Sequence, residues 1–126
     1  MDSKIASIVD KKISNVLNEF LKVNGVTTAA IVGRDGFVIE STANSDIDMD
    51  ALGAMVATAV GTAESLGREF GFENMDQYLS EFSQGKVIMA TVKDDILALF
   101  TDTSAIIGAV RFAIKKSMPD VLRTLR

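Results

Sequence analysis

The segment MDALGAMVATAVGTAESLG, residues 49–67, has the composition of a helix that is covered on most of its circumference. No charged residue occurs from Ala51 through Ala63, although the segment holds three glycines. Each glycine costs a helix interior roughly 1 kcal/mol relative to alanine. A helix that covers only one face of a sheet has a polar back, and the charge-free part of this one has almost none. The fold therefore has to supply a second contact.

Two interpretations of that contact stay open. Gly53, Ala57 and Gly61 lie four residues apart and share one helical face, which Ser65 extends by a turn. The glycines can simply lie close against the sheet of the same chain. Alternatively, the apolar stripe packs on the sheet while the row Gly53, Ala57 and Gly61 meets a second copy. The second interpretation predicts a homodimer, because a two-fold contact is the commonest way to bury such a surface.

The remaining hydrophobic periods predict two further helices and five strands. An amphipathic helix is expected over about 3–23, and strands over 26–32 and 37–41 with the hairpin turn Gly33-Arg34-Asp35-Gly36, whose Arg34 and Asp35 should lie in solvent. The charge-free helix should cover about 48–70, followed by strands over 78–83, 86–92 and 96–101. The final helix should be capped by Thr103 or Ser104 and should kink or restart at Pro119.

This order, α-β-β-α-β-β-β-α, predicts an α/β (α+β) sandwich in a single domain over residues 1–126. Its five-stranded antiparallel sheet should carry helices on both faces. The almost wholly apolar strand 96–101 should be central, whereas the short alternating segment YLSEFS looks like an edge that needs a partner. Pairing of two copies there would extend the sheet, with Tyr78, Ser80 and Phe82 at the dimer interface.

The composition excludes several kinds of chemistry. The chain has no His and no Cys, which removes the commonest general base, thiolate chemistry and the usual zinc ligands. Asp46, Asp48 and Asp50 have calcium-loop spacing, but Ala51 and Ala57 stand where that loop needs Gly and Glu, so these acids are expected to cap a helix. No phosphate-binding loop occurs. We expect no catalytic site, no cofactor site and no metal site.

Charge and hydropathy limit the partners. A formal net charge of −4 disfavours nucleic acid, and the charge-free run is too short for a membrane span, so a cytoplasmic protein is expected. The last helix nevertheless has a basic C-terminal half with Asp120 as its acid. Its cations are Arg111, Lys115, Lys116, Arg123 and Arg126. They form either a solvated face that complements the helix dipole or a contact for an acidic partner or an anionic membrane.

The whole pattern resembles the roadblock family, named after a dynein light chain. The resemblance rests on VNGVTTAAIVGRDGFVIES, similar to the Gly-Val entry into the first strand and the Asp-Gly hairpin of the family. It rests also on DDILALFTDTSAIIGAVRFAIKK, similar to the last strand and helix, including Gly108 and Arg111. It covers nearly all of the chain and implies a profilin-like sandwich that dimerises through the second helix and the third strand.

The resemblance also implies a function. Family members bind small Ras-like GTPases, and the bacterial motility-GTPase activators called MglB are the nearest functional model. It implies a homodimeric, non-enzymatic regulator or scaffold that binds a Ras-like GTPase and stimulates its GTP hydrolysis. The exposed face of the second helix, around Thr58, Thr62 and Ser65, is the expected partner-binding surface. One alternative is an assembly subunit that pairs with other roadblock-type chains independently of nucleotide, as dynein light chains do. Another is a small-ligand sensor with a cavity between helix and sheet.

Overall fold

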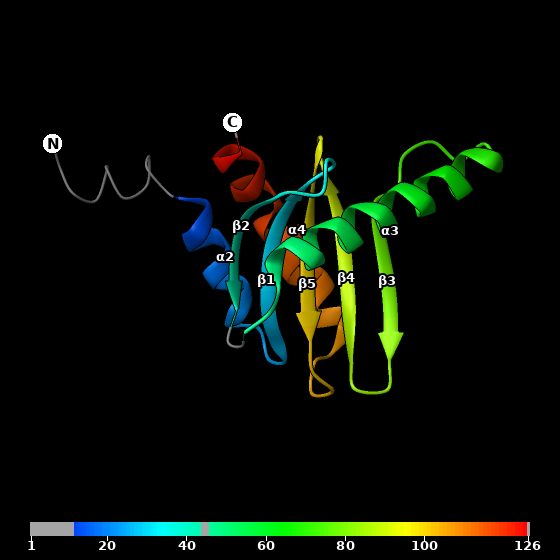
Figure 1. The fold of residues 1–126 in the computed structure, drawn as a ribbon. Helices are drawn as coiled ribbons and strands as arrows, with labels where there is room; N and C mark the ends of the chain where they lie inside the picture. Colours follow the sequence, from blue (N-terminus) through cyan, green and yellow to red (C-terminus); the bar gives the residue numbers. More distant parts are fainter. Residues whose placement is uncertain (1–11, 44–45, 126) are drawn as a thin grey trace, which may run out of the picture.

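The computed structural model describes residues 12–43 and 46–125 (Figure 1). These residues follow the predicted order of helices and strands, while the expected helical turns over residues 3–11 lie outside them. The elements are α2 (Ile13–Leu21), β1 (Val26–Gly33), β2 (Val38–Ala43), α3 (Met49–Glu69), β3 (Gln77–Phe82), β4 (Gly85–Val92), β5 (Asp95–Thr101) and α4 (Ile107–Thr124). Most predicted boundaries agree to within one or two residues.

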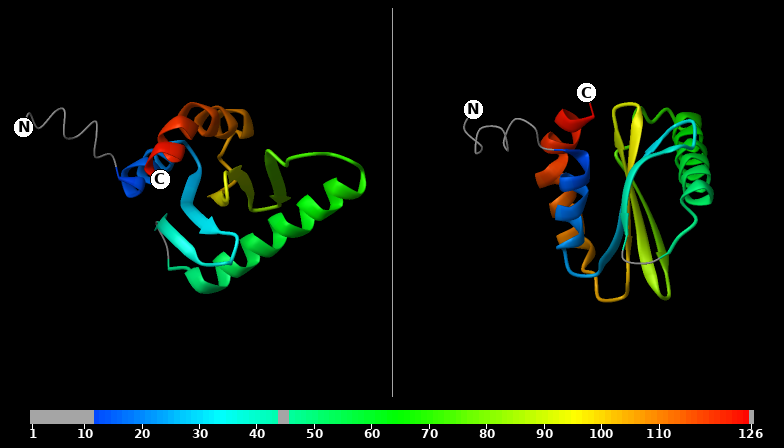
Figure 2. Two further views of the ribbon diagram at one scale, coloured as in Figure 1. Left: turned by 90° about the horizontal axis from the view of Figure 1, so that it is seen from above. Right: turned by 60° about the vertical axis from the view of Figure 1, so that its left-hand side comes forward.

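The five strands form one antiparallel sheet in the order β2-β1-β5-β4-β3. The prediction of an apolar central strand is confirmed by β5, and the prediction of an edge is confirmed by β3. Side chains alternate along each strand, so β1 contributes Ile31 to the core under α2 and α4 and Val32 to the core under α3. Figure 2 shows these helices as layers on opposite faces of the sheet.

The layer of α2 and α4 covers β1, β2 and β4. Phe20, Leu17 and Val16 of α2 are buried, as the apolar stripe predicts, together with Val110 and Ile114 of α4. The expected continuous first helix is wrong at Lys12, whose backbone is extended with φ −80° and ψ 152°, so that α2 begins at Ile13. No helix among the described residues is long and apolar enough to cross a membrane.

The last helix differs from the prediction in two ways. Asp102 accepts a hydrogen bond from the backbone N of Ser104 at 2.8 Å, which holds Thr103 and Ser104 in a turn. The helix therefore begins only at Ile107, without a side-chain cap. It then continues through Pro119 as one helix, so the predicted restart at Pro119 is wrong, while a kink there stays a prediction. Pro119 is exposed, so water can satisfy the carbonyl group that proline leaves without a donor.

The entrance to α3 follows the sequence prediction. Asp48 is the N-cap, and its Oδ1 accepts a hydrogen bond from the backbone N of Ala51 at 3.2 Å. The β1–β2 hairpin is also confirmed, with Gly36 at φ +91° and its N donating to Gly33 O at 2.9 Å. Arg34 and Asp35 are exposed, but Arg34 is not free in solvent: its guanidinium binds both carboxylate oxygens of Glu64 on α3. The ion pair ties the hairpin to the helix.

Candidate protein-interaction surface

Helix α3 lies obliquely on the sheet and leaves part of that face uncovered (Figure 1). It contacts β1, β2 and β5. Between α3 and the β4–β3 side of the sheet lies a hollow of about 430 Å³, which we call the α3–β3 groove. Its walls are Ile47, Asp48, Ala51, Leu52, Met55, Val56, Ala59, Tyr78, Ser80, Phe82, Val87, Met89 and Phe100.

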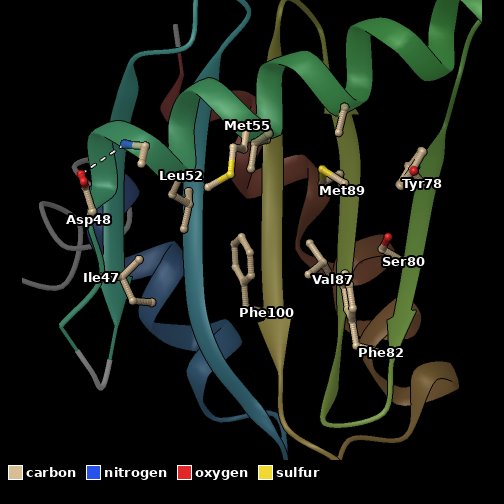
Figure 3. A pocket seen from close by; sticks show the side chains of 13 residues that line it. Ile47, Asp48, Leu52, Met55, Tyr78, Ser80, Phe82, Val87, Met89 and Phe100 are labelled. Carbon is tan, nitrogen blue, oxygen red and sulfur yellow. Dashed lines mark hydrogen bonds between the residues drawn. The ribbon is translucent and has the colours of Figure 1, made fainter.

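The α3–β3 groove brings together the three β3 residues that the sequence predicts for a dimer interface. Tyr78, Ser80 and Phe82 line it from the edge strand, and Figure 3 shows them on the same side of the sheet as Val87 and Phe100. Phe82 remains 61% exposed and Met55, on α3, 65% exposed. The only carboxylate of the groove, Asp48, already caps α3. Such a surface is suited to the apolar side chains of a partner.

The outer face of α3 is exposed and uncharged in its middle. Thr58 and Thr62 are exposed, and their hydroxyls donate to the carbonyl oxygens of Ala54 and Thr58 at 2.8 and 2.9 Å. Each hydroxyl is thereby engaged within the helix, and the methyl groups are available to a partner. Ser65, one turn further on, is exposed and accepts a hydrogen bond from Arg68 at 3.0 Å. The three residues predicted to bind a partner thus share one accessible surface.

The row Gly53, Ala57 and Gly61 divides between two environments. Gly53 is buried, and a β-carbon there would lie 2.3 Å from the carbonyl oxygen of Gly36, so this glycine packs against its own chain. Ala57 is half-buried. Gly61 is exposed, and a β-carbon there would meet no atom within 4 Å. The first interpretation of the glycines therefore holds for Gly53, while a contact of Ala57 and Gly61 with a second copy stays a prediction.

The C-terminal turns of α3 project beyond β3, the edge of the sheet (Figure 2, left). Leu66, Phe70 and Phe72 are exposed by 63%, 71% and 67% on this projection. The rings of Phe70 and Phe72 stack, with their centroids 5.8 Å apart. We call these three residues the α3 overhang. They make a second apolar surface beside the α3–β3 groove.

The two edges of the sheet are unequal. Edge strand β2 has an irregular register beside Ile31 and Val32 of β1, and such a bulge hinders pairing with another strand. Edge strand β3 pairs with β4 in an unbroken register from Gln77 to Phe82. Its free side is therefore the regular edge, open to a further strand.

Sequence reasoning missed part of this surface. Met55, Val87, Met89 and Phe100 line the groove, although none of them was predicted as an interface residue. The α3 overhang was missed as well. Two features of the sequence indicate these residues. On α3, Met55 and Leu66 lie away from the buried stripe, which consists of Leu52, Val56 and Val60. On β4, strand alternation places Val87 and Met89 on one face of the sheet. Neither feature says that α3 stops short of covering β4.

Two titratable groups of the described residues have shifted pKa values, and each shift comes from a hydrogen bond within the fold. The hydrogen bond to Glu64 raises the pKa of Arg34, although desolvation opposes this. Hydrogen bonds from Ser104 lower the pKa of Asp102. Neither residue lines the α3–β3 groove.

Comparison with known proteins agrees with this architecture. The sequence profile of the Roadblock/LC7 domain matches residues 12–101. The chain belongs to the Roadblock/LC7 family. A relative in Methanocaldococcus jannaschii, the uncharacterized protein MJ0714, is 33% identical over 110 residues, which are 87% of this chain and 93% of the relative.

Two solved structures have the same fold. Myxococcus xanthus MglB superposes with a TM-score of 0.84 at 22% identity, covering 90% of this chain and 94% of MglB. A Roadblock/LC7 domain from Streptomyces avermitilis superposes with a TM-score of 0.83 at 17% identity, covering 90% and 98%. At these identities the likeness concerns the fold.

Proposed function

We propose that this Roadblock/LC7 chain forms a homodimer that binds a small Ras-like GTPase as a non-enzymatic regulator or scaffold in the cytoplasm. The observation that carries the proposal is the uncovered apolar surface of α3 and β3, on a fold shared with MglB. The sequence has no His and no Cys. In this proposal, stimulated GTP hydrolysis uses the residues of the GTPase, which docking holds in place.

The geometry of one chain supports the dimer. If two β3 edges pair antiparallel, the two-fold axis is perpendicular to the sheet, so both α3 helices lie on the same side. The α3 overhang of each copy then extends over the partner's sheet, where the α3–β3 groove is open. Leu66 and Phe70 would fill the groove beside Phe82 of the partner subunit.

The outer face of α3 remains for the GTPase. Thr58, Thr62 and Ser65 are exposed along it, and the charged Arg68 lies at its C-terminal end, where it donates to Ser65. In the dimer two such faces lie side by side, which makes a surface larger than one helix can offer.

Affinity capture with this chain as bait tests the function. Parallel captures from source-cell lysate use GDP in one and a non-hydrolysable GTP analogue in the other. Retention of a Ras-like GTPase only with the GTP analogue supports the regulator, and a hydrolysis assay follows. A bait with Ala54→Glu, which places a charge on the outer face of α3, should lose that GTPase.

A second candidate function follows from the same edge. The free side of β3 consists of backbone groups, which any roadblock-type chain can pair with. An assembly subunit predicts that the same roadblock-type chain or motor subunit is retained with both nucleotides. Capture of neither kind of partner would contradict both functions.

A further inference from the structure

The layer of α2 and α4 is positively charged on a chain whose formal net charge is −4. Residues 12–22 and 107–124 contain six cationic and two acidic side chains, whereas the other described residues contain four and thirteen. The cations of the layer are Lys12, Lys22, Arg111, Lys115, Lys116 and Arg123. We call the outer surface that they form the cationic layer. The charge of the fold is thus strongly asymmetric.

The two acids of the cationic layer are already engaged. Glu19 pairs with Lys22 at 3.1 Å, and Asp120 pairs with Arg123 at 3.3 Å. Among the described residues, no ion pair involves Arg111, Lys115 or Lys116, and all three are exposed. Positive charge is therefore available along the outer side of α4.

An aromatic ring stands among these cations. Phe112 is 67% exposed, directly after Arg111 and three and four residues before Lys115 and Lys116. Residues three and four apart share one helix face, so Phe112, Lys115 and Lys116 are neighbours on α4. The binding of a helix to a membrane surface gains both from buried apolar area and from electrostatic attraction to anionic lipids.

We propose that the cationic layer docks the protein on an anionic lipid surface. Arg111 and Arg123 are separated by about 18 Å along the helix at 1.5 Å per residue, which suits a diffuse anionic surface better than a single carboxylate. Asp76 is exposed and lines the same hollow as Arg111 and Lys115, so it lowers the positive potential at that end of the layer. With Asp76 counted, the six cations of the cationic layer still exceed the three acids.

The docking does not require the proposed dimer, but the dimer would strengthen it. Antiparallel pairing of two β3 edges places both cationic layers on one side of the joined sheet and both α3 helices on the other. Two linked cationic layers bind a surface more tightly than one. The α3 face would point away from the lipid and remain accessible to a GTPase.

Sedimentation with lipid vesicles tests the proposal on the full chain, without any GTPase. Vesicles contain phosphatidylcholine alone or with phosphatidylserine, at low and at high ionic strength. The chain should bind only vesicles with phosphatidylserine, and high salt should release it. Lys115→Gln combined with Lys116→Gln should weaken binding roughly 25-fold, at about fivefold for each lysine.

The matched control removes two cations that lie outside the cationic layer. Arg68→Gln combined with Lys93→Asn changes the net charge equally, and asparagine tolerates the φ of +55° at Lys93. This variant should bind like the parent, and circular dichroism should show both variants folded. Absence of binding to phosphatidylserine, or equal loss in both variants, would overturn the proposal. So would binding to soluble polyglutamate without binding to vesicles, since the partner would then be an acidic protein.

The oligomeric state is measured in parallel by sedimentation velocity. A monomer that still binds phosphatidylserine would contradict the dimer and leave the lipid docking intact. A dimer that does not bind phosphatidylserine would contradict the lipid docking and leave the proposed dimer intact.

Discussion

Gly53 of α3 and Gly36 of the β1–β2 hairpin touch through backbone atoms: a β-carbon on Gly53 would lie 2.3 Å from the carbonyl oxygen of Gly36. The same β-carbon would lie 3.0 Å from Cγ2 of Val38. A backbone carbonyl cannot move aside as the end of a side chain can. The helix therefore reaches the hairpin only because position 53 has no side chain.

Two glycine-to-alanine substitutions in one helix should have opposite effects on stability. Gly53→Ala should destabilise the fold by about 1–3 kcal/mol, the usual cost of overpacking. Gly61→Ala should stabilise it by up to about 1 kcal/mol, because alanine is the better helix former and position 61 has free space. Urea unfolding at one protein concentration measures both. Equal effects would contradict the assigned packing of Gly53.

The ion pair between Arg34 and Glu64 should couple the hairpin to α3 weakly. Side-chain exposures of 38% and 19% leave it partly screened, so a double-mutant cycle with Arg34→Gln and Glu64→Gln should give about 0.5–1 kcal/mol. Added salt should reduce the coupling. A coupling free energy of zero would show that the pair does not hold the hairpin.

The architecture was predictable from the sequence because local signals agree with one another. Alternation in the strands, the Asp-Gly turn and the Asp48 cap each determine their own segment. The start of α4 was not predictable in this way. The carboxylate of Asp102 accepts hydrogen bonds from the backbone N and the hydroxyl of Ser104, so the helix begins only after this turn. Hydrophobic periodicity does not report such hydrogen bonds.

Asp102 should make stability depend on pH in the acid range. Hydrogen bonds from Ser104 lower its pKa in the folded state, so its stabilisation is present above the ordinary carboxyl pKa of about 3.9 and is lost as pH falls through the lower folded value. Asp102→Asn should therefore lower the Tm modestly at neutral pH. The difference from the parent should shrink below about pH 4. A difference independent of pH would contradict the role of the carboxylate.

A charge on the outer face of α3 should act differently from the same charge on α4. Ala54 and Ala109 are both exposed on helices, on opposite sides of the sheet. Ala54→Glu should weaken capture of the proposed GTPase at least tenfold, because a carboxylate buried at an interface without a partner is costly. Ala109→Glu should leave the capture unchanged. Affinity capture with the GTP analogue compares the two variants, and equal retention would remove Ala54 from the contact.

The candidate surface was only partly predictable. The charge-free helix and the β3 edge are visible in the sequence, and Tyr78, Ser80 and Phe82 do share one groove. The angle of α3 across the sheet depends on the contact between Gly53 and Gly36, which are distant in sequence. That angle decides that Gly53 faces inward and that the α3 overhang projects beyond β3, so neither result follows from helical spacing alone.

Pairing of two copies through β3 is the claim on which the proposed function rests, and a distance between spin labels tests it most directly. The chain has no Cys, so Glu81→Cys on β3 and Ile39→Cys on β2 each give one labelled position per copy. Strands lie about 4.8 Å apart. Pairing through β3 therefore predicts labels within about 20 Å of each other at position 81 and about 43 Å apart at position 39. A short distance at position 39 with a long one at position 81, or no intermolecular distance at either, would contradict the account.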